Sequence, residues 1–177
     1  MFAVLKHGEW GREVGKLTVT AERRAEWDGL EAQLSGCLRD LEKTGAPRLE
    51  HQPAVSTEAG IYLFVDKGKP IYVGQSRHLR NRLANHCQPG GRHNSASLAF
   101  NIAKCNYEEK YDSKELPKTR AEIESHPKFE ELFTDAKLSL DNMEVRWIEV
   151  ESAELRTVLE VYVAVLLGTK YNSFETH

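Results

Sequence analysis

The clearest structural signal in the chain is GIYLFVDKGKPIYVG, residues 60–74. Two short apolar runs flank a polar loop, Asp66-Lys67-Gly68, and this pattern predicts a β-hairpin. A three-residue loop with its glycine as a left-handed bulge pairs Tyr62 with Tyr72, so that both phenols stand on one face. A loop of two or four residues would instead pair Tyr62 with Val73 and place the tyrosines on opposite faces.

A short helix is predicted after the hairpin, from a Ser76 cap to about Cys87. Leu79 and Leu83 repeat at helical spacing, and we expect them to pack on the sheet. The neighbouring side of the helix carries three polar residues four positions apart: His78, Arg82 and His86. An arginine in this place can bind a phosphate through two parallel hydrogen bonds.

Positive charge gathers around this hairpin and helix, although the whole chain has a net charge of −3. Residues 60–93 hold six Lys or Arg residues against Asp66 alone: Lys67, Lys69, Arg77, Arg80, Arg82 and Arg92. A basic segment within an acidic chain indicates a local site for an anion such as phosphate. A solvated surface is the alternative interpretation of the same charges.

Two short motifs frame the hairpin, Gly60-Ile61-Tyr62 and Ile71-Tyr72-Val73-Gly74, the second with Val at its third position. With Arg82 at a fixed spacing after them, they resemble the GIY-YIG nuclease family, in which this arginine belongs to the active site. His86 matches the histidine of the homing and restriction members, where repair members tend to have tyrosine.

A second part of the resemblance lies in the apolar helix predicted for residues 153–167. Glu160 stands in the middle of this helix, where a carboxylate is costly to bury unless it is paired or bound to a metal. Arg156, one turn earlier, is the alternative partner. The resemblance implies that Glu160 is the family's metal-binding glutamate and that Asn172 is the asparagine that follows it. As a plain turn residue, Asn172 would need no such role.

The resemblance implies a metal-dependent endonuclease that hydrolyses DNA phosphodiester bonds with one Mg²⁺ (or Mn²⁺) ion on Glu160. Arg82 would bind the phosphate, and Asn172 would brace the site. Tyr62 is the preferred general base, with Tyr72 or His86 as its helper, although the sequence does not separate the three. The expected DNA-contacting residues are Gly74, Arg77, His78, Arg80 and Arg92.

The expected fold is α+β and sandwich-like: a small central antiparallel sheet of the GIY-YIG type, flanked by helices. Residues 1–55 form an N-terminal extension with a long helix over about 21–43, capped by Thr20. Residues 56–177 form the nuclease domain, with a helical insert over about 88–141. Within the insert, a Thr119–Glu122 capping box and Pro127 each predict the start of a helix.

Other features bear on partners and location. The absence of a long apolar run argues against a membrane span. Three dispersed cysteines are typical of reduced thiols in the cytoplasm. Dimerisation through the N-terminal helix or the insert is a further expectation. The family branch expected is a stand-alone restriction, defence or mobile-element nuclease. The alternative is a module of the same fold that binds nucleic acid without cutting it.

Overall fold

The computed structural model describes residues 19–44, 55–88, 90–111 and 115–174. The chain divides into two compact units, residues 1–33 and residues 34–177. Helix α1 (Ala21–Lys43) crosses the boundary between the units. The predicted cap is confirmed, because the Thr20 hydroxyl accepts a hydrogen bond from the Arg23 amide at 3.3 Å. No described helix is long and apolar enough to cross a membrane.

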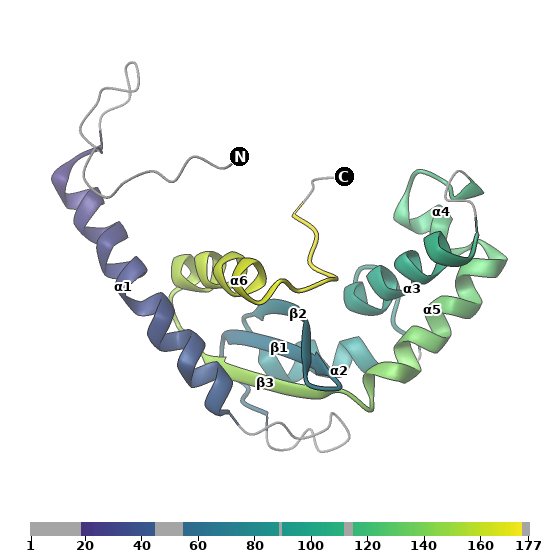
Figure 1. The fold of residues 1–177 in the computed structure, drawn as a ribbon, viewed down its shortest axis with the longest axis horizontal. Coiled ribbons are helices and arrows are strands. Elements are labelled where there is room, and N and C mark those ends of the chain that lie inside the picture. Colours follow the sequence, from purple (N-terminus) through teal and green to yellow (C-terminus); the bar gives the residue numbers. More distant parts are fainter. Residues whose placement is uncertain (1–18, 45–54, 89, 112–114, 175–177) are drawn as a thin grey trace. The chain divides into compact units, whose positions relative to one another are not determined.

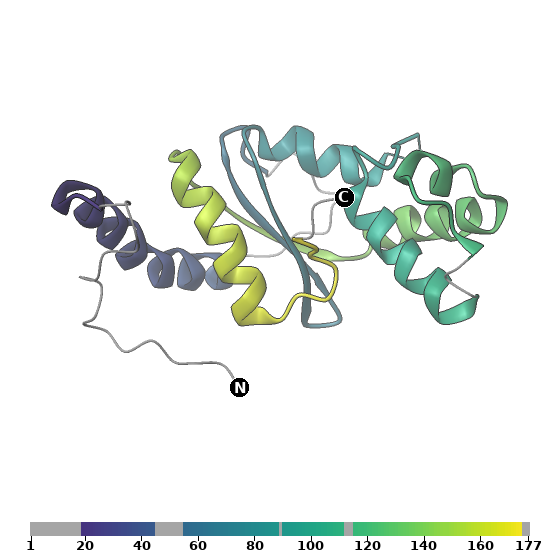
Figure 2. The ribbon, with the colours of Figure 1, turned by 90° about the horizontal axis from the view of Figure 1, so that it is seen from above.

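The second unit is built around a three-stranded antiparallel sheet in the order β2-β1-β3. Its elements follow the chain as β1 (Gly60–Asp66), β2 (Lys69–Ser76), α2 (Leu79–Cys87), α3 (Ser97–Lys110), α4 (Arg120–Glu124), α5 (Pro127–Leu140), β3 (Glu144–Glu149) and α6 (Ala153–Leu167). Figures 1 and 2 place α2 and α6 on opposite faces of the sheet. The predicted α+β fold with a small flanked sheet is confirmed.

The central strand β1 is buried along nearly its whole length because helices cover both faces of the sheet. Tyr62 and Phe64 alternate with residues of the other face and join a core that includes Leu79 and Leu83 of α2. The predicted packing of these two leucines is therefore confirmed.

The hairpin register differs from the prediction, and the pairing of Tyr62 with Tyr72 is wrong. The loop has only two central residues, Lys67 and Gly68, with φ values of 50° and 77°. Two positive φ values in a row are the signature of a type I′ turn, and Asp66 accordingly pairs with Lys69.

A bulge then changes the register a second time. It falls between Phe64 and Val65 on β1, so that Val65 pairs with Pro70 and Phe64 pairs with Tyr72. Pro70 has no amide hydrogen to give to the ladder, and prolines are confined to such irregular places in sheets. Tyr62 therefore lies opposite Gly74. The two unpredicted shifts add to two residues, which restores the face, so Tyr62 and Tyr72 share a face as diagonal neighbours with ring centroids 6.3 Å apart.

The pairing of Tyr62 with Gly74 explains why position 74 has no side chain. A Cβ atom at position 74 would lie 2.4 Å from the Tyr62 hydroxyl oxygen, closer than atoms can approach. The Tyr62 ring therefore occupies the space that any other side chain at position 74 would fill.

The helix starts follow their predicted signals with one exception. The Thr119–Glu122 capping box and Pro127 begin α4 and α5, and Ser152 caps α6. The Ser76 cap is wrong: α2 begins at Leu79 after His78, which makes no side-chain cap. The Ser76 hydroxyl instead accepts the His78 amide at 3.0 Å, in a local turn that competes with capping.

Candidate active site

A buried hydrogen-bonded cluster joins β1 to α2. The Tyr62 hydroxyl lies 2.9 Å from His86 Nε2, and Arg82 Nε donates to the same hydroxyl at 3.2 Å. Tyr62 is 1% exposed and His86 is fully buried. Three residues of the predicted site therefore meet at one phenol oxygen.

Burial controls the protonation of this cluster. Loss of solvent and the nearby Arg82 charge lower the pKa of His86 to about 3, so the imidazole is neutral at pH 7. Burial also raises the pKa of Tyr62 well above its usual value, so the phenol keeps its proton. Because Arg82 donates to the phenol oxygen, the Tyr62 hydroxyl can donate to His86 Nε2. His86 Nδ1 then carries the ring hydrogen, without a hydrogen-bond partner among the described residues.

The Arg82 guanidinium is held from the helical insert. One terminal nitrogen donates to the Ser95 carbonyl oxygen at 2.9 Å, and the other donates to Ser97 Oγ at 2.8 Å. Burial lowers the pKa of Arg82, but the neighbouring Tyr62 and Tyr72 phenols outweigh it and raise the pKa. The arginine is therefore a fixed, charged group.

Glu160 and Tyr72 line one cavity of about 340 Å³, together with Asn172 and residues of the insert. Glu160 accepts a hydrogen bond from Gln75 Nε2 at 2.9 Å. Burial raises the pKa of Glu160, while the Gln75 hydrogen bond and the Arg82 charge oppose this rise. The carboxylate thus lies within the electrostatic reach of Arg82.

The alternative partner of Glu160 is engaged elsewhere. Arg156 donates to the carbonyl oxygens of Val150 and Glu151, at 2.8 and 2.6 Å, and so holds the start of α6. The ion pair between Arg156 and Glu160, one interpretation of the sequence, is therefore not what positions the glutamate.

Asn172 fixes the C-terminal segment to the outer side of β2. Its side-chain oxygen accepts from the Val73 amide at 2.9 Å, and its side-chain nitrogen donates to the Val73 carbonyl at 2.8 Å. The Thr169 hydroxyl donates to the same Asn172 oxygen at 2.8 Å. This bracing holds Asn172 at the wall of the cavity that contains Glu160.

The predicted DNA-contacting residues are placed differently from one another. Gly74 lies beneath the Tyr62 ring. Arg77 is exposed and lines a neighbouring hollow together with Gln75. His78 is exposed just before α2, and Arg80 donates to the Val55 carbonyl oxygen. None of these lines the cavity of Glu160 and Tyr72.

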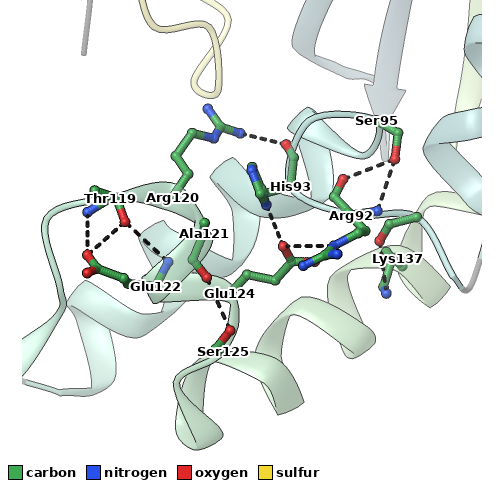
Figure 3. Close-up of polar contacts among 11 residues, drawn as sticks. Arg92, His93, Ser95, Thr119, Arg120, Ala121, Glu122, Glu124, Ser125 and Lys137 are labelled. Carbon is green, nitrogen blue, oxygen red and sulfur yellow. Dashed lines mark hydrogen bonds and ion pairs between the residues drawn. The ribbon is translucent and has the colours of Figure 1, made fainter.

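Arg92, another predicted DNA-contacting residue, lies on the insert and does not line the cavity of Glu160 and Tyr72. Its guanidinium is exposed, with Nε 3.7 Å from a Glu124 carboxylate oxygen (Figure 3). The same carboxylate is hydrogen-bonded to His93 Nδ1, which ties the loop before α3 to α4. Burial raises the pKa of Glu124, but the bond to His93 outweighs it and holds the pKa below its usual range.

Sequence reasoning missed Arg120, which lines the cavity beside Tyr72. Its guanidinium carbon lies 4.1 Å from the Phe100 ring centroid. One guanidinium nitrogen donates to the His93 carbonyl at 3.1 Å (Figure 3). A signal was present, because Arg120 is the first residue of α4, where a positive charge opposes the helix dipole. Ser97, Asn101 and Gln75 were missed as well and carry no such signal.

Glu160 is the candidate ligand for a metal ion in this cavity. The described residues contain no group of three or more His, Cys, Asp or Glu side chains that could hold one. A single half-buried carboxylate, Glu160, faces the cavity. Mg²⁺ is commonly held by one or two carboxylates while water and substrate phosphate complete its shell. The site therefore fits a hard divalent cation that arrives with the substrate.

Residues 58–109 match the model of the UvrC-like GIY-YIG domain. This segment of the chain therefore resembles the GIY-YIG nuclease family. Among curated proteins it resembles UvrABC system protein C of Gloeobacter violaceus, with 43% identity over 58 residues, which cover 32% of this chain and 9% of that protein. The same protein of Deinococcus radiodurans is 40% identical over 40 residues, which cover 23% of this chain and 6% of that protein. The matched part of this chain thus covers less than a tenth of the length of either relative.

Among solved structures, this chain is similar to the magnesium-bound GIY-YIG N-terminal endonuclease domain of UvrC from Thermotoga maritima. It is 20% identical, and the alignment covers 70% of this chain and 93% of that one with a TM-score of 0.38. A point mutant of the same domain, with a tyrosine changed to phenylalanine and the catalytic divalent cation bound, gives 20% identity, coverages of 70% and 92%, and a TM-score of 0.38.

Proposed function

We propose that this chain is a metal-dependent endonuclease that hydrolyses DNA phosphodiester bonds. One observation carries the proposal: a carboxylate, Glu160, and a phenol, Tyr72, line a single cavity within reach of the Arg82 charge. Phosphodiester hydrolysis needs a cation site, a proton acceptor and a fixed positive charge. The cavity contains the first two groups, and the Arg82 charge acts on Glu160 from outside its lining.

Glu160 would hold one Mg²⁺ or Mn²⁺ ion, with Gln75 fixing the orientation of the carboxylate. When bound, the ion supplies Lewis acidity for the phosphate and for the leaving oxygen. Asn172 and Thr169 keep the opposite wall in place through β2. The hydrogen bond from Gln75 also keeps Glu160 from turning out of the cavity.

The geometry favours Tyr72 over Tyr62 as the group that accepts a proton from water. Tyr62 and His86 are closed off from solvent, whereas Tyr72 lines the cavity. Arg120 lines the same cavity as Tyr72 and adds a positive charge there. We therefore assign Tyr62 and His86 to holding Arg82 in place. This assignment replaces the preference for Tyr62 that the sequence suggested.

The proposal is tested with purified protein, supercoiled plasmid and Mg²⁺. Glu160→Gln should lower the cleavage rate by at least about a hundredfold, as is typical when a group that stabilises transition-state charge is removed. Glu131→Gln is the matched control, because Glu131 is an exposed carboxylate on α5 and should change the rate little. Equal rates for wild type and Glu160→Gln, or no cleavage of any DNA, would refute the proposal.

The alternative is a module that binds nucleic acid without cutting. The basic residues around the hairpin support binding equally well. They do not explain Glu160, because a carboxylate in the cavity repels phosphate unless a cation accompanies it. Cleavage that depends on added Mg²⁺ separates the two functions.

We further propose that the nuclease serves in restriction, defence or a mobile element, acting on DNA in the cytoplasm. His86 at the place where repair members tend to have tyrosine supports this branch. A dimer through α1 or the insert would let two sites act together, and gel filtration at several concentrations tests that part. Sequencing the DNA ends produced from a random pool tests the branch, because specific ends indicate restriction or homing.

A further inference from the structure

A second cavity, of about 530 Å³, adjoins the one that holds Glu160. It lies between α3, the start of α4 and residues 170–173. The two cavities share four lining residues: Asn101, Arg120, Asn172 and Ser173. The second cavity is therefore a direct neighbour of the cavity that contains Glu160.

The second cavity is basic, although the chain as a whole is acidic. Its charged lining consists of four cations and one carboxylate: Lys104, Lys118, Arg120, Lys170 and Glu108. Lys104 lies 4.0 Å from Glu108, and Lys170 lies 3.4 Å from Glu109. Exposed ion pairs of this kind contribute little free energy, so phosphate can replace the carboxylates.

The cavity also contains an aromatic side chain on a fixed backbone. Tyr171 lines it and is half-buried. Its amide donates to the Ile71 carbonyl at 3.0 Å, and its carbonyl accepts from Asn101 Nδ2 at 2.9 Å. The backbone of Tyr171 is thus tied both to β2 and to α3. An aromatic ring held in this way can stack on a nucleobase.

Arg120 stands on the wall between the two cavities. Its guanidinium lies over the Phe100 ring. It also donates a hydrogen bond to the His93 carbonyl (Figure 3). Arg120 Nε makes no hydrogen bond with a described residue. Because Arg120 lines both cavities, its positive charge can attract a phosphate that lies between them.

We propose that the second cavity binds a nucleotide of an unpaired DNA strand next to the phosphate that is cut. This inference rests on the proposed nuclease function and names its substrate class. Lys104, Lys118, Arg120 and Lys170 bind the backbone, and Tyr171 stacks on the base. A base paired within a duplex cannot enter a concave cavity, so the site selects DNA with a single-stranded segment beside the cut.

Binding is measured by fluorescence anisotropy without added metal, on Glu160→Gln protein, so that no DNA is cut. The probes are a labelled single strand, the blunt duplex of the same sequence, and a duplex with a single-stranded overhang. The single strand and the overhang should bind at least about tenfold more tightly than the blunt duplex. Equal affinity for the three probes would overturn the proposal.

Two sets of variants locate the binding. Lys118→Ala with Lys170→Ala should weaken single-strand binding about tenfold and reduce the slope of log affinity against log salt by about 1.4, for two lost phosphate contacts. Tyr171→Leu should weaken it about tenfold through lost stacking. The charge-matched control is Lys43→Ala with Lys128→Ala, at exposed lysines that line neither cavity, which should leave the affinity unchanged.

The outcomes separate this inference from the proposed function. If wild-type protein cuts blunt duplex and overhang DNA equally fast, and the cavity variants behave like the control, the nuclease stands and the subsite falls. If the cavity variants lose single-strand binding but no DNA is cut, the subsite stands and the nuclease falls. Saturation by a free mononucleotide, without preference for the oligonucleotide, would make this a small-molecule site and overturn the proposal.

Discussion

At the scale of single residues, Gly74 is the position with the least freedom, because the Tyr62 ring lies against it. Gly74→Ala should lower the free energy of unfolding by about 1–3 kcal/mol, the usual cost of overpacking, and should also displace Tyr62 from Arg82. Urea unfolding measures the effect. Gly36→Ala is the control, because Gly36 lies within α1 with open space at its Cβ and should gain about 0.5–1 kcal/mol. Equal effects of the two substitutions would contradict the close contact.

His86 gives a prediction about pH. Its folded-state pKa of about 3 lies below the unfolded value, so on acidification the unfolded chain takes up a proton that the folded protein does not. Stability is therefore fully present above about pH 6.5 and decreases as the pH falls from there toward 3. Between about pH 7 and pH 5, wild type should lose about 2 kcal/mol more than His86→Phe. Urea unfolding at the two pH values measures this difference, and parallel losses would show that His86 is not buried in its neutral form.

At the scale of elements, the type I′ turn can be tested directly. Lys67 adopts a left-handed conformation that asparagine tolerates and most other residues do not. Lys67→Asn should raise the free energy of unfolding by about 0.5–1 kcal/mol, while Lys67→Ala should not raise it. In a three-residue loop with Lys67 in the right-handed region, asparagine would bring no gain over alanine, so thermal unfolding of the two variants decides between the loops.

Periodicity and capping signals predicted the elements well, because they depend on local chemistry. The Thr119–Glu122 capping box and the apolar pattern of α6 are examples. The hairpin register was not predictable in the same way. Lys67 gives no sign of a left-handed conformation, and the bulge between Pro70 and Tyr72 depends on how two strands meet. Tyr62 and Tyr72 do lie on one face of the sheet, as predicted. The three-residue loop and the direct pairing from which this was predicted are wrong.

At the scale of the whole molecule, the limit of prediction was the contact between distant segments. The motif residues could be read from the sequence. Arg120 and Ser97 reach the cavity only because the insert folds back against α2 and β2, and no local pattern encodes that return. Tyr171 likewise meets β2 through a backbone bond across the sheet edge.

The proposed function predicts the order of the products. One chain carries one cavity with Glu160, and one such site cuts one strand at a time. Supercoiled plasmid should therefore be converted first to nicked circles, with linear DNA following after a lag. Gel analysis of a time course measures the two products at several protein concentrations. Linear DNA that forms without a nicked intermediate, at a rate that rises with the square of concentration, would indicate a dimer instead.

The two hydrogen bonds between the Asn172 side chain and the Val73 backbone have a consequence for solubility. β2 is the outer strand of the sheet, and the outward backbone groups of such a strand can recruit a strand from another molecule and start aggregation. The Asn172 amide occupies both outward groups of Val73, and the Tyr171 amide occupies the carbonyl of Ile71. The segment after α6 therefore acts as a substitute for a fourth strand. The same asparagine that braces the cavity also protects the sheet from pairing with its neighbours in solution.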